Sequence, residues 1–139
     1  MDGNPHSGTF AAFFGPTASN GFITQNLTTV AGGLYNLTFW LENDDTTFDN
    51  HFEVSWNGSI ISSLDNAASF GYTQFTFTGL MATSTSTPLQ FGFFNPPSFW
   101  WLDDVSVEAA GTPEGLSTLW LAFPIAGMIA FRLMRRRTA

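Results

Sequence analysis

Aromatic side chains on polar strand faces are the groups in this sequence best suited to bind a ligand. Trp40 shares one face of an alternating stretch with Asn36, and Tyr72 lies on the polar face of a later stretch. An exposed aromatic ring beside amides suits a sugar, because the sugar's C–H face packs on the ring while the amides bond its hydroxyls. The sequence predicts a glycan-binding surface that uses Trp40, Asn36, Tyr72 and Trp100, and Phe99 and Trp101 are further aromatic candidates. The alternative is that Trp40 packs beneath a loop.

A second candidate is the acidic segment over residues 42–50. It holds four carboxylates in nine positions, Glu42, Asp44, Asp45 and Asp49. The segment lacks the glycine and the terminal glutamate of an EF-hand loop. The pattern favours a solvated acidic loop, and a weak calcium site or a site for sugar hydroxyls is the alternative.

Catalytic constellations find no support in the sequence. Glu42 and Glu53 could be imagined as a glycosidase pair, but nothing fixes their separation. His6 and His51 have no identifiable partners, and no nucleophile motif surrounds a serine. With two histidines and no cysteine, a zinc site is improbable. We expect a protein that is not an enzyme.

Charge is distributed very unevenly along the 139 residues. The formal net charge is −7, there is no lysine, and the four arginines all lie at positions 132–137, whereas ten of the eleven carboxylates precede Gly111. This acidic body argues against nucleic acid and anionic lipid surfaces as partners. A body of about 110 residues corresponds to one domain.

The body has the period-2 alternation and regular turn spacing of an all-β protein. Asn57-Gly58 is the strongest hairpin signal, because both central positions of a type I′ turn need positive φ. We predict an antiparallel β-sandwich of the jelly-roll type over residues 1–110. The expected strands are Gly8–Phe14, Phe22–Thr29, Leu34–Glu42, His51–Trp56, Ser59–Ser63, Tyr72–Thr78, Pro88–Phe94 and Phe99–Val107.

A short apolar run follows the body, from Leu116 to Phe131. It shows no polar face, and a basic cluster follows it, which is the charge layout of a membrane segment with its arginines on the cytoplasmic side. The sequence predicts a linker over 111–115, a single transmembrane helix over 116–134 and a cytoplasmic tail over 135–139. The membrane stop is formed by Arg132, Arg135, Arg136 and Arg137. The alternative is an amphipathic helix packed on the body.

This C-terminal arrangement resembles the PEP-CTERM sorting signal of Gram-negative bacteria. Pro113-Glu114 matches the motif, Gly115 stands where the family has a second proline, and the apolar run and the arginine cluster follow in the family's order. The resemblance implies a sorting protease of the exosortase type as partner. It also implies a precursor anchored in the inner membrane, with the body outside the cytoplasm and then released to the envelope or medium. The family is associated with exopolysaccharide.

The body resembles the galactose-binding-like jelly rolls of carbohydrate-binding modules. The resemblance rests on residues 6–13, 23–27, 35–41, 52–58 and 101–107. It implies a calcium role for Asp103 or Asp104 with ligands from an opening strand. A complete calcium shell needs six to eight oxygens, and a solvated aspartate at a strand bend is the alternative. The opening strand with its Asn-Gly-x-Phe-Glu type motif is missing, so we expect a chain truncated at its N-terminus that has also lost a signal peptide.

Together these features predict an exported, non-catalytic protein that binds extracellular polysaccharide. The sequence establishes no cofactor, and a structural calcium ion is the only candidate. Two rival hypotheses remain, namely a structural matrix protein without a ligand and a non-functional gene fragment.

Overall fold

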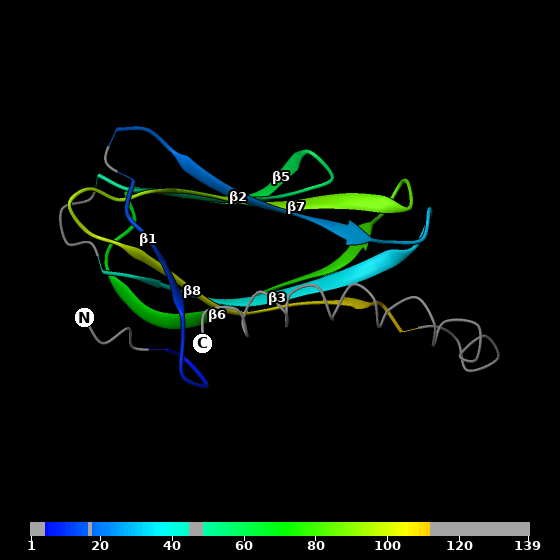
Figure 1. Cartoon of the computed structure of the whole chain (residues 1–139), viewed down its shortest axis with the longest axis horizontal. Coiled ribbons are helices and arrows are strands. Elements are labelled where there is room, and N and C mark those ends of the chain that lie inside the picture. The colour runs from blue at the N-terminus through cyan, green and yellow to red at the C-terminus, as the bar shows by residue number, and fades with distance from the viewer. Residues whose placement is uncertain (1–4, 17, 45–48, 112–139) are drawn as a thin grey trace.

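Successive strands of the chain are shared between two stacked antiparallel sheets (Figure 1). The computed structural model describes residues 5–16, 18–44 and 49–111. The eight strands are β1 (Ala12–Phe14), β2 (Gly21–Thr28), β3 (Leu34–Asn43), β4 (His51–Trp56), β5 (Ser59–Asp65), β6 (Phe70–Met81), β7 (Ser86–Phe94) and β8 (Trp100–Ala109). Sheet A has the order β1-β8-β3-β6 and sheet B the order β2-β7-β4-β5. These two orders are those of an eight-stranded jelly roll, so the predicted all-β sandwich is confirmed.

Only the strand His51–Trp56 has the predicted bounds; the others differ at one or both ends, and three of the differences have a clear cause. β1 spans only Ala12–Phe14, because residues 6–9 form bends instead of extending the strand. β6 is longer than expected, since it pairs with β3 from Phe70 to Met81. β7 begins at Ser86, where a loop was predicted, because Ser86 pairs with Thr28 of β2.

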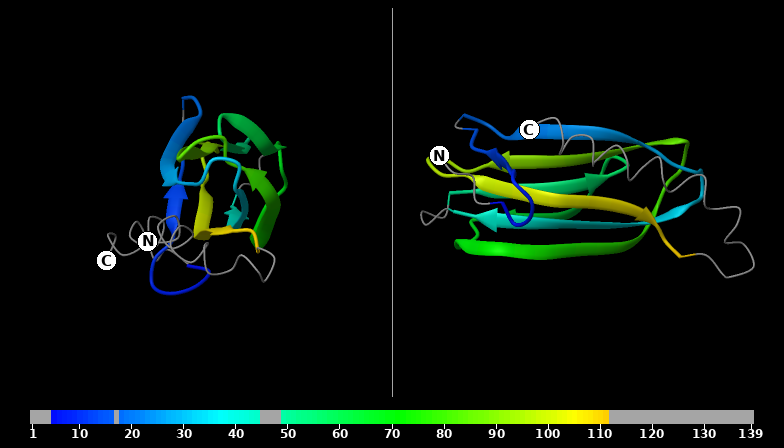
Figure 2. Two further views of the ribbon diagram at one scale, coloured as in Figure 1. Left: turned by 90° about the vertical axis from the view of Figure 1, so that its right-hand side faces the viewer. Right: turned by 60° about the horizontal axis from the view of Figure 1, so that its bottom comes forward.

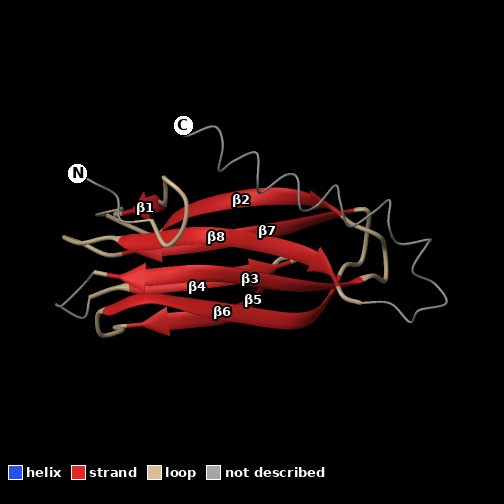
Figure 3. Cartoon of the chain, turned by 90° about the horizontal axis from the view of Figure 1, so that it is seen from below, coloured by secondary structure: helices blue, strands red, loops and turns tan. Residues whose placement is uncertain are grey.

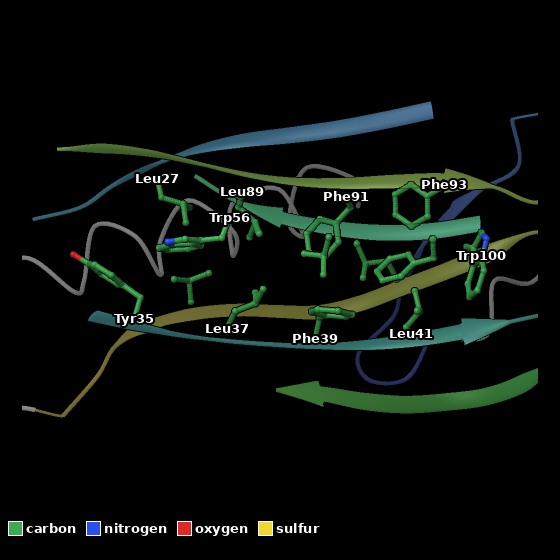
Figure 4. Packing of buried hydrophobic residues seen from close by; sticks show 14 of the residues in the cluster. Leu27, Tyr35, Leu37, Phe39, Leu41, Trp56, Leu89, Phe91, Phe93 and Trp100 are labelled. Carbon is green, nitrogen blue, oxygen red and sulfur yellow. The ribbon is translucent and has the colours of Figure 1, made fainter. Parts of the chain in front are cut away.

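The core lies between the inner faces of the two sheets, as Figure 4 shows. Phe39 of β3 contacts Phe52 of β4 and Phe91 of β7, with ring centroids 5.9 and 5.2 Å apart. All three rings are 0–2 % exposed. Full burial of such a ring contributes about 2–3 kcal/mol to folding. Aromatic contact across the gap is therefore a main source of adhesion between the sheets.

The β4–β5 hairpin turns at Asn57-Gly58, where the backbone has φ of +52° and +82°. Two consecutive positive φ values define the type I′ geometry that the dipeptide predicted. Trp56, the last residue of β4, is buried, and its Nε1 donates to the Met81 carbonyl at 2.8 Å.

Three buried or nearly buried asparagines close one end of the sandwich. Asn95 Nδ2 donates to Asn43 Oδ1 at 2.9 Å. The Asn43 and Asn50 amides both donate to the Ala67 carbonyl, and the Ala67 amide donates back to Asn50 Oδ1. Buried backbone groups need such partners, and these side chains supply them for the loop between β5 and β6.

The segment ahead of β1 crosses the outer face of sheet A. Figure 2 (right) and Figure 3 both show it in front of β8. Contacts between His6, Ser7 and residues of β3 and β8 confirm this placement. A side chain on this outer face is therefore covered by the segment or open to solvent, according to its position.

The predicted sorting motif, membrane helix and basic cluster, over residues 113–137, lie outside the described residues. Within residues 5–16, 18–44 and 49–111, no helix has the length and hydrophobicity to cross a membrane.

Phe52→Ala should lower the free energy of unfolding by about 3–5 kcal/mol, because it leaves a cavity between the sheets. Urea denaturation of the full-length chain measures this. Phe22→Ala is the matched control, since Phe22 is 51 % exposed on the outer face of sheet B; it should cost about 1 kcal/mol or less. Equal losses for the two variants would contradict this account of the core.

Candidate functional site

Aromatic and acidic side chains gather on the outer face of sheet A, where β3 ends and β8 begins. The strand register places Trp40 beside Asp103, and Trp101 between Glu42 and Phe13. Tyr72 lies on β6, in the irregular stretch opposite Glu42. We call this set the aromatic–acidic surface; its members are Phe13, Trp40, Glu42, Asp44, Tyr72, Trp101, Asp103 and Asp104.

The indole of Trp40 is covered by the imidazole of His6. The two rings are nearly parallel, with centroids 3.6 Å apart and an interplanar angle of 16°. The His6 ring also meets the Tyr72 ring edge-on, with centroids 5.5 Å apart. Trp40 thus lies on the outer face as predicted and is also packed beneath a chain segment, and its contact with a glycan stays a prediction.

An irregularity in β8 brings two adjacent carboxylates to the outer face. The register between β3 and β8 shifts between Thr38 and Trp40, opposite Asp104 and its neighbours. Asp104 has φ of +51°, and its amide donates to Asp103 Oδ1 at 2.7 Å. The left-handed region is accessible to aspartate at small cost. This β-bulge inserts one extra residue, so neither carboxylate has to enter the core.

Ser7 and His6 bind both of these carboxylates. The Ser7 amide donates to Asp103 Oδ2 at 3.2 Å, and its hydroxyl approaches both oxygens of Asp104 at 2.9 and 2.7 Å. His6 Nδ1 donates to Asp104 Oδ2 at 2.9 Å. As a result, Asp103 is only 4 % exposed although it lies on an outer face.

The carboxylates of Asp103 and Asp104, which the resemblance assigns to calcium, bind donors of the chain itself. Every carboxylate oxygen of Asp103 and Asp104 accepts a hydrogen bond from the chain's own donors. Calcium takes six to eight oxygen ligands. In the part of the chain that the structure describes, no group of three or more histidine, aspartate or glutamate side chains could hold a metal ion. The predicted calcium role stays a prediction.

Burial and like charges raise two pKa values on this surface. Burial, and then the hydrogen bond and charge of Asp44, raise the pKa of Glu42, against a lowering contribution from the Tyr72 backbone. Burial, followed by the charge of Asp103 and the other carboxylates, raises the pKa of the Tyr72 phenol. Among the described residues, no hydrogen-bond partner reaches the buried Tyr72 hydroxyl. The surface therefore concentrates negative charge around one buried hydroxyl that has no partner among the described residues.

Trp101 is the second tryptophan on this surface, and like Trp40 it is half-buried. Its ring contacts Phe13 and Phe99, with centroids 5.3 and 6.5 Å apart, and its Nε1 donates to the Asp44 carboxylate. Phe13 itself is 55 % exposed. Phe13 was not in the predicted set.

Two of the predicted binding residues have other roles. Trp100 is wholly buried, contacts Phe52 and donates from Nε1 to the Phe94 carbonyl, so its prediction as a ligand-contacting residue is wrong. Because successive side chains of a strand point to opposite faces, its neighbour Trp101 faces outward. Asn36 lies on the outer face as expected, but its Oδ1 accepts the Gly79 amide at the irregular pairing of β6.

Both histidines have partners that sequence reasoning missed. His51 Nδ1 donates to Asp65 at 2.6 Å and its Nε2 to Glu53 at 3.0 Å, on the outer face of sheet B. Partial burial alone would lower the pKa of His51, but hydrogen bonds and charge from Glu53 and Asp65 outweigh it and raise the pKa. The sequence could have indicated Glu53 as a partner, because it lies two residues further along β4 and so on the same face as His51. Asp65 could be identified only from the register between β4 and β5.

Comparison with known proteins supports the architecture. No protein-family model matches the chain, and no curated protein does so either. Among solved structures, the chain is similar to the carbohydrate-binding module TmCBM61, whose structure was solved in complex with β-1,4-galactotriose. The TM-score is 0.55 at 14 % sequence identity, over 77 % of this chain and 75 % of that chain. At this identity the likeness shows a shared β-sandwich fold.

His51→Gln should destabilise the protein more at acidic than at alkaline pH. Since the folded-state pKa is raised, the stabilisation is fully present below the unfolded value of about 6.5 and is lost as pH rises through the folded pKa. Denaturation of both proteins across this range measures the difference. In the Glu53→Gln variant, the His51 pKa measured by NMR should fall. A stability difference between the wild type and His51→Gln that widens with rising pH would contradict this role of His51.

Proposed function

We propose that this chain is a non-catalytic carbohydrate-binding protein and that the aromatic–acidic surface contacts the sugar. The observation that carries the proposal is the outward placement of two tryptophans and a tyrosine among carboxylates on one sheet face. Aromatic rings on an outer face contribute nothing to the core. They provide flat apolar surfaces for sugar rings, and the carboxylates accept hydrogen bonds from sugar hydroxyls.

The aromatic rings of this surface differ in what covers them. Trp101 and Phe13 pack against each other, and Phe13 is more than half exposed. Trp40 reaches a sugar only when residues 6 and 7 move aside, because the His6 ring occupies its face. We expect Trp101 to dominate a first contact and Trp40 to extend the binding surface.

The fold likeness to a carbohydrate-binding module supports this proposal without fixing the ligand. The rival hypothesis of a structural matrix protein assigns the acidic surface to solubility or cation bridging. The two hypotheses differ in one respect, because only sugar binding depends on the outward aromatic rings.

Trp101→Ala and Trp40→Ala should each reduce retention in affinity electrophoresis on extracellular polysaccharide from the organism that carries the gene. Loss of one stacking ring at a binding surface costs roughly 1–2 kcal/mol, or about five- to thirtyfold in affinity. Phe22→Ala is the matched control, since it removes an exposed ring from the opposite sheet. A β-1,4-galactan gel provides a defined second polysaccharide. Unchanged retention in both tryptophan variants would favour the matrix hypothesis.

We also propose that the protein is exported, sorted by an exosortase-type protease and delivered to the envelope or medium. The support is the order of Pro113-Glu114, the apolar run and the terminal arginines in the sequence.

Intact-mass measurement of the protein from membrane and medium fractions tests the sorting proposal. We expect a membrane form that retains the arginine cluster and a medium form that ends near Gly111. Replacing Pro113-Glu114 by Ala-Ala should leave the membrane form and remove the medium form. A medium form that keeps Arg135 would contradict sorting.

A further inference from the structure

The aromatic–acidic surface holds several carboxylates, and few basic side chains lie near it in the part of the chain that the structure describes. The sequence has no lysine, and its arginines all lie at positions 132–137. Of the two histidines, His51 is bound to Glu53 and Asp65 on sheet B. Over the described ranges, His6 is therefore the basic side chain that contacts this surface.

The contacts of His6 indicate what kind of group this surface accommodates. A flat ring lies parallel to the Trp40 indole, and a nitrogen on that ring donates to the Asp104 carboxylate 2.9 Å away. A pyranose ring stacks on an indole in the same manner, and an amino group on it can reach the same carboxylate. Cations are also attracted to the indole face itself.

The Tyr72 hydroxyl adds a second observation that points to an absent ligand. The oxygen is buried beside the His6 ring, and within the described residues it has no hydrogen-bond partner. A buried hydroxyl without a partner is costly. A ligand that displaces His6 would bring polar groups next to this oxygen, and an ammonium group among them would be a donor.

Resting on the proposed function, we infer that the polysaccharide carries free amino groups, as in a glucosamine-containing polymer. One amino sugar takes the place of the His6 imidazole on Trp40, and its ammonium group binds Asp104. N-acetylated sugars lose this charge, and uronic acids meet carboxylates of the same sign. Residues 6 and 7 act as an internal competitor for the site.

Isothermal titration of the full-length chain in a neutral detergent compares two matched probes. The probes are the β-1,4-linked tetrasaccharides of glucosamine and of N-acetylglucosamine, at low salt and at a mildly acidic pH where the amines are charged. We expect the glucosamine form to bind about tenfold or more tightly, the factor that corresponds to 1.4 kcal/mol.

Two variants locate the effect. Asp104→Asn should abolish most of the preference for the amino form, and asparagine still tolerates the positive φ of this position. Asp65→Asn changes the net charge equally on the opposite sheet and should retain the preference. His6→Ala should strengthen binding of the glucosamine form several-fold, because it removes the competitor.

The outcomes separate this inference from the proposed function. Equal, Trp101-dependent binding of the two probes, or of galactan alone, would overturn the amino-sugar inference and leave carbohydrate binding intact. Equal losses in Asp104→Asn and Asp65→Asn would show general attraction of a polycation and overturn the inference. Weaker binding by His6→Ala would overturn the placement on Trp40. Absence of saturable binding to either probe and to the polysaccharides above would overturn both proposals.

Discussion

Burial of aromatic rings between the two sheets is the constraint on which the rest of the structure depends. Phe39, Phe52 and Phe91 meet across the gap with almost no exposed surface. Because side chains alternate along a strand, fixing Phe39 inward fixes Trp40 outward. A register slip by one residue would bury Trp40 and expose the phenylalanine. The core therefore determines which aromatic rings lie on the outer face.

The bulge at Asp104 is where this alternation is broken, and the site depends on the break. Strict alternation after Asp103 would direct Asp104 inward, where an unpaired carboxylate is very costly. The left-handed backbone at Asp104 and its hydrogen bond to Asp103 avoid that outcome. Two carboxylates then lie beside Trp40, and Ser7 and His6 bind them. The bulge that keeps Asp104 out of the core thus also concentrates negative charge at one point of the sheet.

Local patterns predicted the fold well and the site only in part. Alternation and the Asn57-Gly58 turn were sufficient for the strands, because each signal acts over a few residues. Trp40 and Tyr72 were placed on the correct face for the same reason. Trp100 was wrongly assigned to the outer face. Of two adjacent tryptophans in a strand one must face inward and the other outward, and the sequence does not say which. The pairing of Trp100 with the buried Asn43 decides it. The contacts of His6 with Trp40 and Asp104 join residues far apart in sequence, and no local pattern encodes them.

Coverage of Trp40 by His6 sets how any ligand competes for the surface. A ligand that stacks on Trp40 must replace one ring contact and the hydrogen bonds of Ser7 and His6 to Asp104. Its affinity is the difference between its own contacts and those it displaces. A neutral sugar replaces the stacking of His6 on Trp40, but its hydroxyls are weaker donors to Asp104 than a cationic group is. A sugar that brings its own positive charge replaces both contacts, so the closed state of the surface itself discriminates between ligands.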